Sequence, residues 1–152
     1  MDYDTLLTES DKIGLTVKEK PLKYNNGRIK GNRIAIRQDI STQTEKSCVL
    51  AEELGHYHTT YGDILDLDNV QNRKQEFRAR MWGYDRLIGL KGIIQAYKRG
   101  CRNPAEMAEE LDVTEEYLLD ALNAYRSKFG TRTTADGYVI YFEPSLAVMK
   151  LY

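Results

Sequence analysis

Residues 15–37 constrain the fold most, because turn signals and alternation occur together in this short stretch. Asn26-Gly27 and Gly31-Asn32 are dipeptides that favour tight turns. Ile34 and Ile36 lie on one side of an extended chain and their polar or small neighbours on the other, which is the period of a half-buried strand. The stretch is therefore expected to form a small three-stranded antiparallel sheet.

Helical patterns dominate the chain after this predicted sheet. Thr42 and Glu45 fit a capping box, in which each side chain accepts a hydrogen bond from the other residue's backbone N–H. A helix is therefore expected over about residues 43–59. A second long helix is expected over residues 72–90, because its apolar residues recur at the helical period.

The last third of the chain is also predicted to be mostly helical. Pro104 suits the first turn of one helix, and Thr114 is a suitable N-cap for the next. Residues 138–142 are predicted to form a final strand. A sheet followed by a run of helices predicts an α+β fold. The expected organisation is one domain over residues 1–152, with a motif-bearing core at 15–90 and a helical C-terminal part with a terminal strand at 91–152.

Composition excludes several classes of function. The net charge is −1, which gives no electrostatic basis for a nucleic-acid or membrane partner. The helical segment after Thr114 begins with Glu115 and Glu116, whose carboxylates would face phosphates if it entered a DNA groove. No run approaches the roughly 20 apolar residues that a membrane span needs. Without a signal peptide, a cytoplasmic protein with reduced Cys48 and Cys101 is expected.

Residues 52–56 carry the chemistry, because they read Glu-Glu-Leu-Gly-His. Zinc peptidases use HExxH on a helix, where ligands at i and i+4 share one face and the Glu between them is the general base. Glu52 and His56 keep that spacing, a carboxylate oxygen can replace an imidazole on zinc, and Glu53 keeps the base position. Glu76 on the second helix is the candidate third ligand.

The Glu52–His56 pair and Glu76 can each also be explained without a metal. A Glu four residues before a His can be a simple surface pair. Glu76 can be an exposed first-turn carboxylate that interacts favourably with the helix dipole. His58 lies on nearly the opposite helix face from His56, so a surface or supporting role is expected for it. Cys48 lies two helical turns from His56, too far to share one ion, and is expected in the core.

Two segments resemble the signatures of one known family. Residues 50–57 resemble the LAHELGHY segment of the ImmA/IrrE metallopeptidases, and Glu76-x-x-Ala79-x-x-Trp82-Gly83-x-x-x-Leu87 resembles that family's second signature, E-x-x-A-N-x-F-A-x-x-x-L. The resemblance covers residues 15–90 well and the rest loosely. It implies a zincin-like body and a zinc endopeptidase of a phage or mobile element that acts on helix-turn-helix repressors. Carried over by position, the implied metal ligands are Glu52, His56 and Glu76, and the implied base is Glu53.

The chain departs from the family pattern at the metal itself. Glu52 replaces the first His ligand, Arg80 stands where Asn is usual, and Gly83 replaces Ala. A Glu-His-Glu set carries one more negative charge than His-His-Glu and is harder, so zinc, manganese or no metal at all remain open. The alternative function is a catalytically silent ImmA/IrrE-like protein, which binds a repressor or other regulator without cleaving it.

Overall fold

The computed structural model describes residues 1–59 and 70–151 of the chain. The chain divides into two compact units, Met1–Arg86 and Leu87–Tyr152. Both units combine helices with a small sheet, so the expected α+β class is confirmed. The expectation of a single domain over residues 1–152 stays a prediction.

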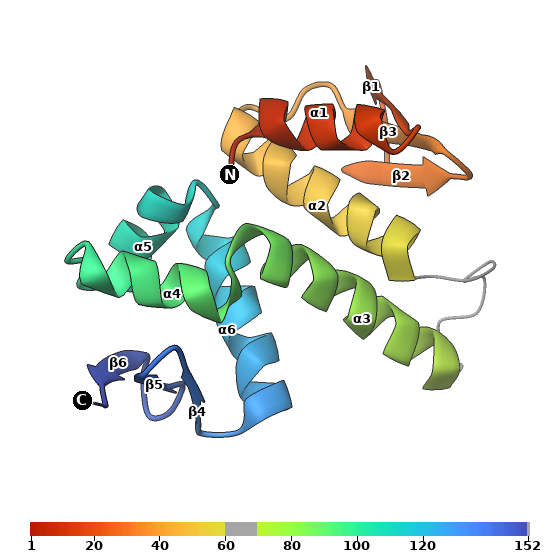
Figure 1. Cartoon of the computed structure of the whole chain (residues 1–152). Coiled ribbons are helices and arrows are strands. Elements are labelled where there is room, and N and C mark those ends of the chain that lie inside the picture. The colour runs from red at the N-terminus through yellow and green to blue at the C-terminus, as the bar shows by residue number, and fades with distance from the viewer. Residues whose placement is uncertain (60–69, 152) are drawn as a thin grey trace. The chain divides into compact units, whose positions relative to one another are not determined.

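The first unit begins with a helix, a three-stranded sheet and a second helix (Figure 1). Asp2 caps the opening helix by accepting a hydrogen bond from the backbone N–H of Thr5 at 2.8 Å. The elements in chain order are α1 (Tyr3–Lys12), β1 (Thr16–Lys20), β2 (Gly27–Lys30), β3 (Arg33–Arg37), α2 (Gln43–Thr59) and α3 (Val70–Leu87), which ends at the boundary between the units.

The sheet of the first unit is mixed, in the order β1-β3-β2. The β2–β3 hairpin is antiparallel and turns at Gly31, whose φ of +60° favours glycine. β1 pairs with β3 in parallel, with Thr16 opposite Arg33, so the expectation of an all-antiparallel sheet was wrong in this pair. After β1 the chain skips one strand position and forms β2 at the far edge of the sheet. The hairpin then brings β3 back into the position between β2 and β1, where β3 runs in the same direction as β1. Gly27 does not lie in a turn between strands but opens β2.

Helices α1 and α2 pack together on the sheet, α1 against β1 and α2 against β2 and β3. Ile34 and Ile36 of the central strand are buried beneath them, as their alternation predicts. Leu6 of α1 and Leu50 of α2 are fully buried in the same unit. Burying each of these side chains stabilises the fold by about 1.5–3 kcal/mol, so α2 is held firmly against the sheet.

The boundaries of α2 confirm the sequence prediction, whereas α3 ends earlier than expected. The backbone N–H of Glu45 donates to Thr42 Oγ1 at 3.1 Å, which is one half of the predicted capping box. The helix expected to reach residue 90 stops at Leu87, and α4 (Gly89–Lys98) follows. Gly89 has a φ of +64°, a conformation that interrupts a right-handed helix.

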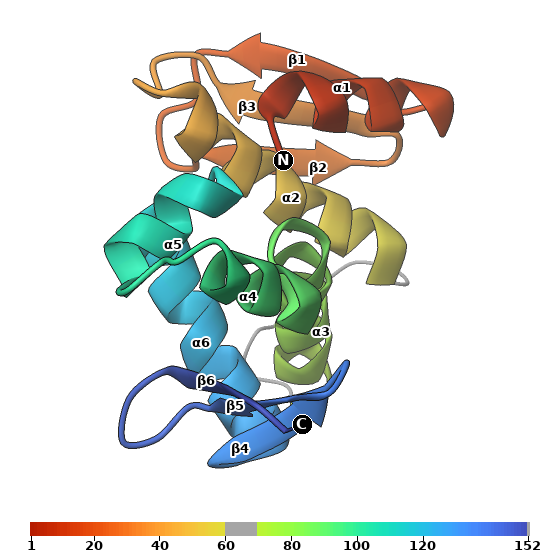
Figure 2. The same cartoon turned by 60° about the vertical axis from the view of Figure 1, so that its left-hand side comes forward.

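The second unit contains α4, α5 (Pro104–Leu111), α6 (Glu115–Phe129) and a second three-stranded sheet (Figure 2). Helices α4 and α6 contact β5 and β4, respectively. Pro104 lies in the first turn of α5, and Thr114 caps α6 by accepting a hydrogen bond from the Tyr117 N–H at 3.1 Å, as expected. The strands are β4 (Arg132–Ala135), β5 (Tyr138–Tyr141) and β6 (Ala147–Lys150), all antiparallel.

Only the middle strand of this second sheet was predicted from the sequence. β4 and β6 are largely exposed, so they carry too few buried side chains to create an apolar alternation. The Asp136-Gly137 pair between β4 and β5 is a hairpin signal, and both residues adopt the positive φ that such turns require. In the described part of the chain, no helix has both the length and the apolar character needed to cross a membrane.

Candidate metal centre

Helix α2 presents Glu52 and His56 on one face because they are four residues apart. Both side chains are half-buried, so their polar atoms remain reachable from solvent. Glu53, one position further along the helix, is directed instead toward the sheet and is only 9% exposed. The helix therefore places two candidate ligands and one buried carboxyl within a single turn.

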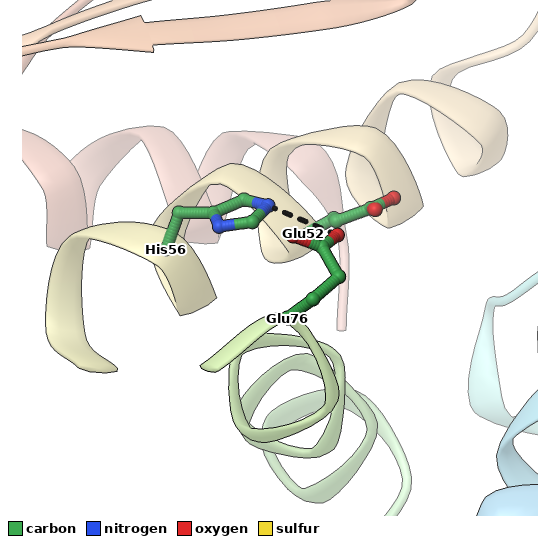
Figure 3. Close-up of side chains that lie close together, drawn as sticks. All are labelled: Glu52, His56 and Glu76. Carbon is green, nitrogen blue, oxygen red and sulfur yellow. Dashed lines mark ion pairs between the residues drawn. The ribbon is translucent and has the colours of Figure 1, made fainter. Parts of the chain in front are cut away.

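Helix α3 supplies the third side chain by crossing α2 at very close range. A Cβ atom built on Gly55 would lie 2.0 Å from the carbonyl oxygen of Ala79, so only glycine permits this approach. Glu76 lies one helical turn before Ala79, on the part of α3 that faces α2 (Figure 3). The close approach of the two backbones thus brings Glu76 beside His56.

The three predicted ligands come together in the structure. Glu52, His56 and Glu76 each offer one ligand atom, and these atoms all lie within 4.8 Å of one another. His56 Nε2 is 3.5 Å from Glu76 Oε1, the pair joined by a dashed line in Figure 3. Ligand atoms around a tetrahedral zinc lie about 3.4 Å apart, given bonds of roughly 2.0–2.2 Å. The His56–Glu76 pair already has that spacing, and Glu52 needs a small side-chain adjustment to reach it.

Arg80 lies beside the same two carboxylates. Its Nε atom is 3.8 Å from Glu52 Oε1 and 3.7 Å from Glu76 Oε1, and the side chain is 55% exposed. These distances are too long for hydrogen bonds. The guanidinium therefore acts on Glu52 and Glu76 through its charge.

Glu53 lies next to this group in an environment that favours its protonated form. Burial raises the pKa of Glu53 to about 7, and the negative charges of Glu52 and Glu76 add to the effect. Gly27 at the start of β2 contacts it so closely that a Cβ there would lie 2.9 Å from Glu53 Cγ. A carboxyl with a pKa near neutrality can take up and release a proton at working pH.

The family of the chain is shown by comparison with known protein families. The chain matches the family model of the IrrE N-terminal-like domain, a peptidase family, over residues 10–123, about three quarters of its length. The chain belongs to this family. The resemblance expected from the two sequence motifs is therefore confirmed, and with it a zincin-like metallopeptidase domain. Searches of curated proteins and of solved structures found no match.

A cleft lies against the buried carboxyl of this IrrE-type domain. It has a volume of about 360 Å³ and is lined by residues 24–27 together with Val49, Glu52 and Glu53. Tyr24 stands at this cleft with 93% of its surface exposed. β2 is an edge strand of the sheet, so its outer backbone groups face away from β3 beside the cleft.

His58 and Cys48, the other potential ligands near this motif in the sequence, are not part of the Glu52–His56–Glu76 cluster. The ring of His58 stacks on Trp82, with centroids 4.5 Å apart and planes 20° from parallel. This contact gives His58 a packing role within the IrrE-type domain, in keeping with the supporting role expected for it. Cys48 is buried and 7% exposed, as expected for a core residue.

Some residues at the site were not found by sequence reasoning. Gly27 was assigned to a turn, yet its missing side chain leaves room for Glu53. Tyr24 and Asn25 carried no motif and Asn26 was assigned only to a turn, because their place in the cleft depends on how β2 is added to the sheet. Arg80 was noted only as a departure from the family pattern, and the four-residue spacing from Glu76 was the available signal of an ion pair.

Proposed function

We propose that the chain is a metal-dependent endopeptidase, in which Glu52, His56 and Glu76 hold a divalent cation and Glu53 is the general base. One observation carries the proposal: three potential ligands from two helices meet within 4.8 Å, beside a buried carboxyl, in a member of a peptidase family. Titratable groups that gather in a cleft, one of them with a strongly raised pKa, are the features by which a candidate functional site is recognised.

The donor set fits a divalent cation. With His56 neutral, the two carboxylates bring a charge of −2 that such a cation would neutralise. One imidazole and two carboxylates are ligands that zinc accepts, and the excess of oxygen donors also suits manganese. Zinc is the first candidate because the family is one of zincin-like domains.

A bound divalent cation would polarise the scissile carbonyl and make a water molecule more acidic. Glu53 accepts the proton of the attacking water as its carboxylate and can return that proton to the leaving amine. Without metal, burial raises the pKa of Glu53 to about 7. A bound divalent cation would lower this pKa and so favour the carboxylate, the form that accepts the proton of the attacking water. Burial against Gly27 keeps the carboxyl in one position beside the cleft.

An extended segment of a protein is the substrate form that suits the cleft. Among the described strands β2 lies at the edge of its sheet, so an added strand can form hydrogen bonds with its outer backbone groups. Such a strand would pass the cleft and present its backbone carbonyls to the metal centre. We further propose that the substrate is a helix-turn-helix repressor of a phage or mobile element, met in the cytoplasm, with no direct contact between this chain and nucleic acid.

The test uses the full chain, loaded separately with zinc and with manganese after treatment with a chelator. The substrate is the helix-turn-helix repressor encoded nearest to it, with denatured casein as a general substrate. Wild type is expected to cleave the repressor, and Glu53→Gln is expected to bind the same amount of metal without cleaving. Equal cleavage by wild type and Glu53→Gln would show that Glu53 is not the base.

A second candidate function is regulator binding without cleavage. Arg80 favours it, because its charge lies within 3.8 Å of two of the three ligands and opposes the entry of a cation. In that case neither metal supports cleavage, and Glu53→Gln and Glu52→His both bind the repressor as wild type does. Measuring repressor binding and cleavage in the same samples separates the two functions.

A further inference from the structure

Arg80 and the metal centre share one carboxylate oxygen. Glu76 Oε1 is 3.5 Å from His56 Nε2 and 3.7 Å from Arg80 Nε, so the same atom faces the imidazole and the guanidinium. Glu52 Oε1 is 3.8 Å from the same nitrogen of Arg80. One cationic side chain is thus close to both anionic ligands of the candidate centre.

The positions of Arg80, Glu76 and Glu52 on the two helices account for both ion pairs. Glu76 precedes Arg80 by four residues on α3, the order in which a helical Glu–Arg pair interacts best. The second contact crosses from α3 to Glu52 on α2, where Gly55 keeps the backbones close. Arg80 therefore balances half of the −2 charge that Glu52 and Glu76 carry together.

We propose that Arg80 is an internal competitor for the divalent cation and sets the metal affinity of this site. The inference rests on the proposed function, because it takes Glu52 and Glu76 as metal ligands. The guanidinium and the cation attract the same two carboxylates, so metal entry must weaken or displace both ion pairs. The half-exposed position of Arg80 lets it swing into solvent when that happens.

The size of the effect follows from the exposure of the pairs. Exposed ion pairs are weak, and each changes an equilibrium by roughly twofold to threefold. Two such pairs therefore lower the affinity for a divalent cation by about threefold to tenfold. Salt screens charges at this exposure, since the Debye length is about 10 Å at 0.1 M. The effect of Arg80 should accordingly shrink as the salt concentration rises.

The experiment measures zinc and manganese affinity of the full chain by competition with a coloured chelator. The variants are wild type, Arg80→Gln, Arg80→Lys and Arg78→Gln. Arg78 is exposed on the same helix two residues away, so its substitution makes the same change in net charge on a different face. Thermal unfolding in the presence of chelator checks that every variant is folded.

Arg80→Gln is expected to bind zinc about threefold to tenfold more tightly than wild type at low salt, with a smaller gain at about 0.5 M salt. Arg78→Gln and Arg80→Lys are expected to stay near wild type. Equal or weaker binding by Arg80→Gln would overturn the competitor role while leaving the metal centre intact. If no metal binds to wild type, to Arg80→Gln or to the double variant Glu52→His with Arg80→Gln, the metal centre fails and the inference fails with it.

Discussion

Gly55 of α2 lies directly against the backbone of Ala79 in α3, so closely that a Cβ on Gly55 would meet the Ala79 carbonyl oxygen at 2.0 Å. This contact fixes the separation of the two helices where the candidate ligands meet. Glu76 reaches His56 because the helices approach this closely, not because of any local preference of its own. Gly55 is therefore as important to the site as the ligands themselves.

Gly55→Ala should lower the free energy of unfolding by about 1–2 kcal/mol and abolish metal binding. Alanine in a helix is ordinarily more stable than glycine by roughly 0.5–1 kcal/mol, but here the added methyl group must push α3 away and overpacking costs more. Urea unfolding and metal titration of the same samples measure both effects.

Gly92→Ala is the matched control, because a Cβ there would lie 3.3 Å from the flexible side-chain end of Leu111. It should change stability little. A Gly55→Ala variant that is as stable as wild type would show that α2 and α3 do not cross as described.

Gly27→Ala should reduce cleavage while leaving metal affinity near that of wild type. The added Cβ would lie 2.8 Å from Val49 Cγ1 and 2.9 Å from Glu53 Cγ, so the base must move. The three atoms nearest to that Cβ belong to Val49 and Glu53, and none of them belongs to a proposed metal ligand. A displacement of about 1 Å in a catalytic group can cost on the order of 100-fold in rate. If Gly27→Ala lost metal affinity and cleavage together, Gly27 would be needed to position the metal ligands and not only Glu53.

Without metal, Glu53 should make the protein less stable as pH rises from about 5 to 8. Its pKa is raised from 4.5 to about 7 in the folded protein, so the folded state holds a proton that the unfolded state has already released. This contribution is most favourable below pH 4.5 and is lost as the pH passes 7. The expected loss is on the order of 2–3 kcal/mol.

The measurement is urea unfolding of wild type and Glu53→Gln at several pH values with a chelator present. The difference in unfolding free energy between the two proteins should shift in favour of Glu53→Gln as pH rises, because glutamine does not titrate. A difference that stays constant from pH 5 to pH 8 would mean that the carboxyl is not buried as the structure shows.

Glu52→His should shift the metal preference toward zinc. The imidazole is the softer ligand and also removes one negative charge, so the oxygen-rich character that suits manganese is reduced. Competition titrations with both metals give the ratio of affinities. A ratio that is unchanged from wild type would show that Glu52 does not contact the cation.

Much of α2 was predictable because its signals are local. Thr42 and Glu45 define its start within four residues of sequence, and the spacing of Glu52 and His56 fixes their common face by helix geometry alone. The two motifs together identified the family correctly. They also selected Glu76, the residue that the structure brings to the other two.

What could not be predicted depends on contacts between distant segments. The parallel pairing of β1 with β3 follows from the path of the chain after β1, for which no residue pattern exists. The fit of Gly27 against Glu53 appears only when β2 and α2 are placed together. β4 and β6 escaped notice because exposed edge strands lack an apolar period, although Asp136-Gly137 marked the hairpin.

Anomalous diffraction from crystals of the full chain grown with zinc, and separately with manganese, tests the central claim most directly. We expect one strong peak per chain, with one oxygen each of Glu52 and Glu76 and one nitrogen of His56 at roughly 2.0–2.2 Å from it. The same peak should persist in Glu53→Gln and vanish in His56→Ala. A peak elsewhere in the chain, or no peak with either metal, would contradict the assignment of the metal centre and the peptidase function built on it.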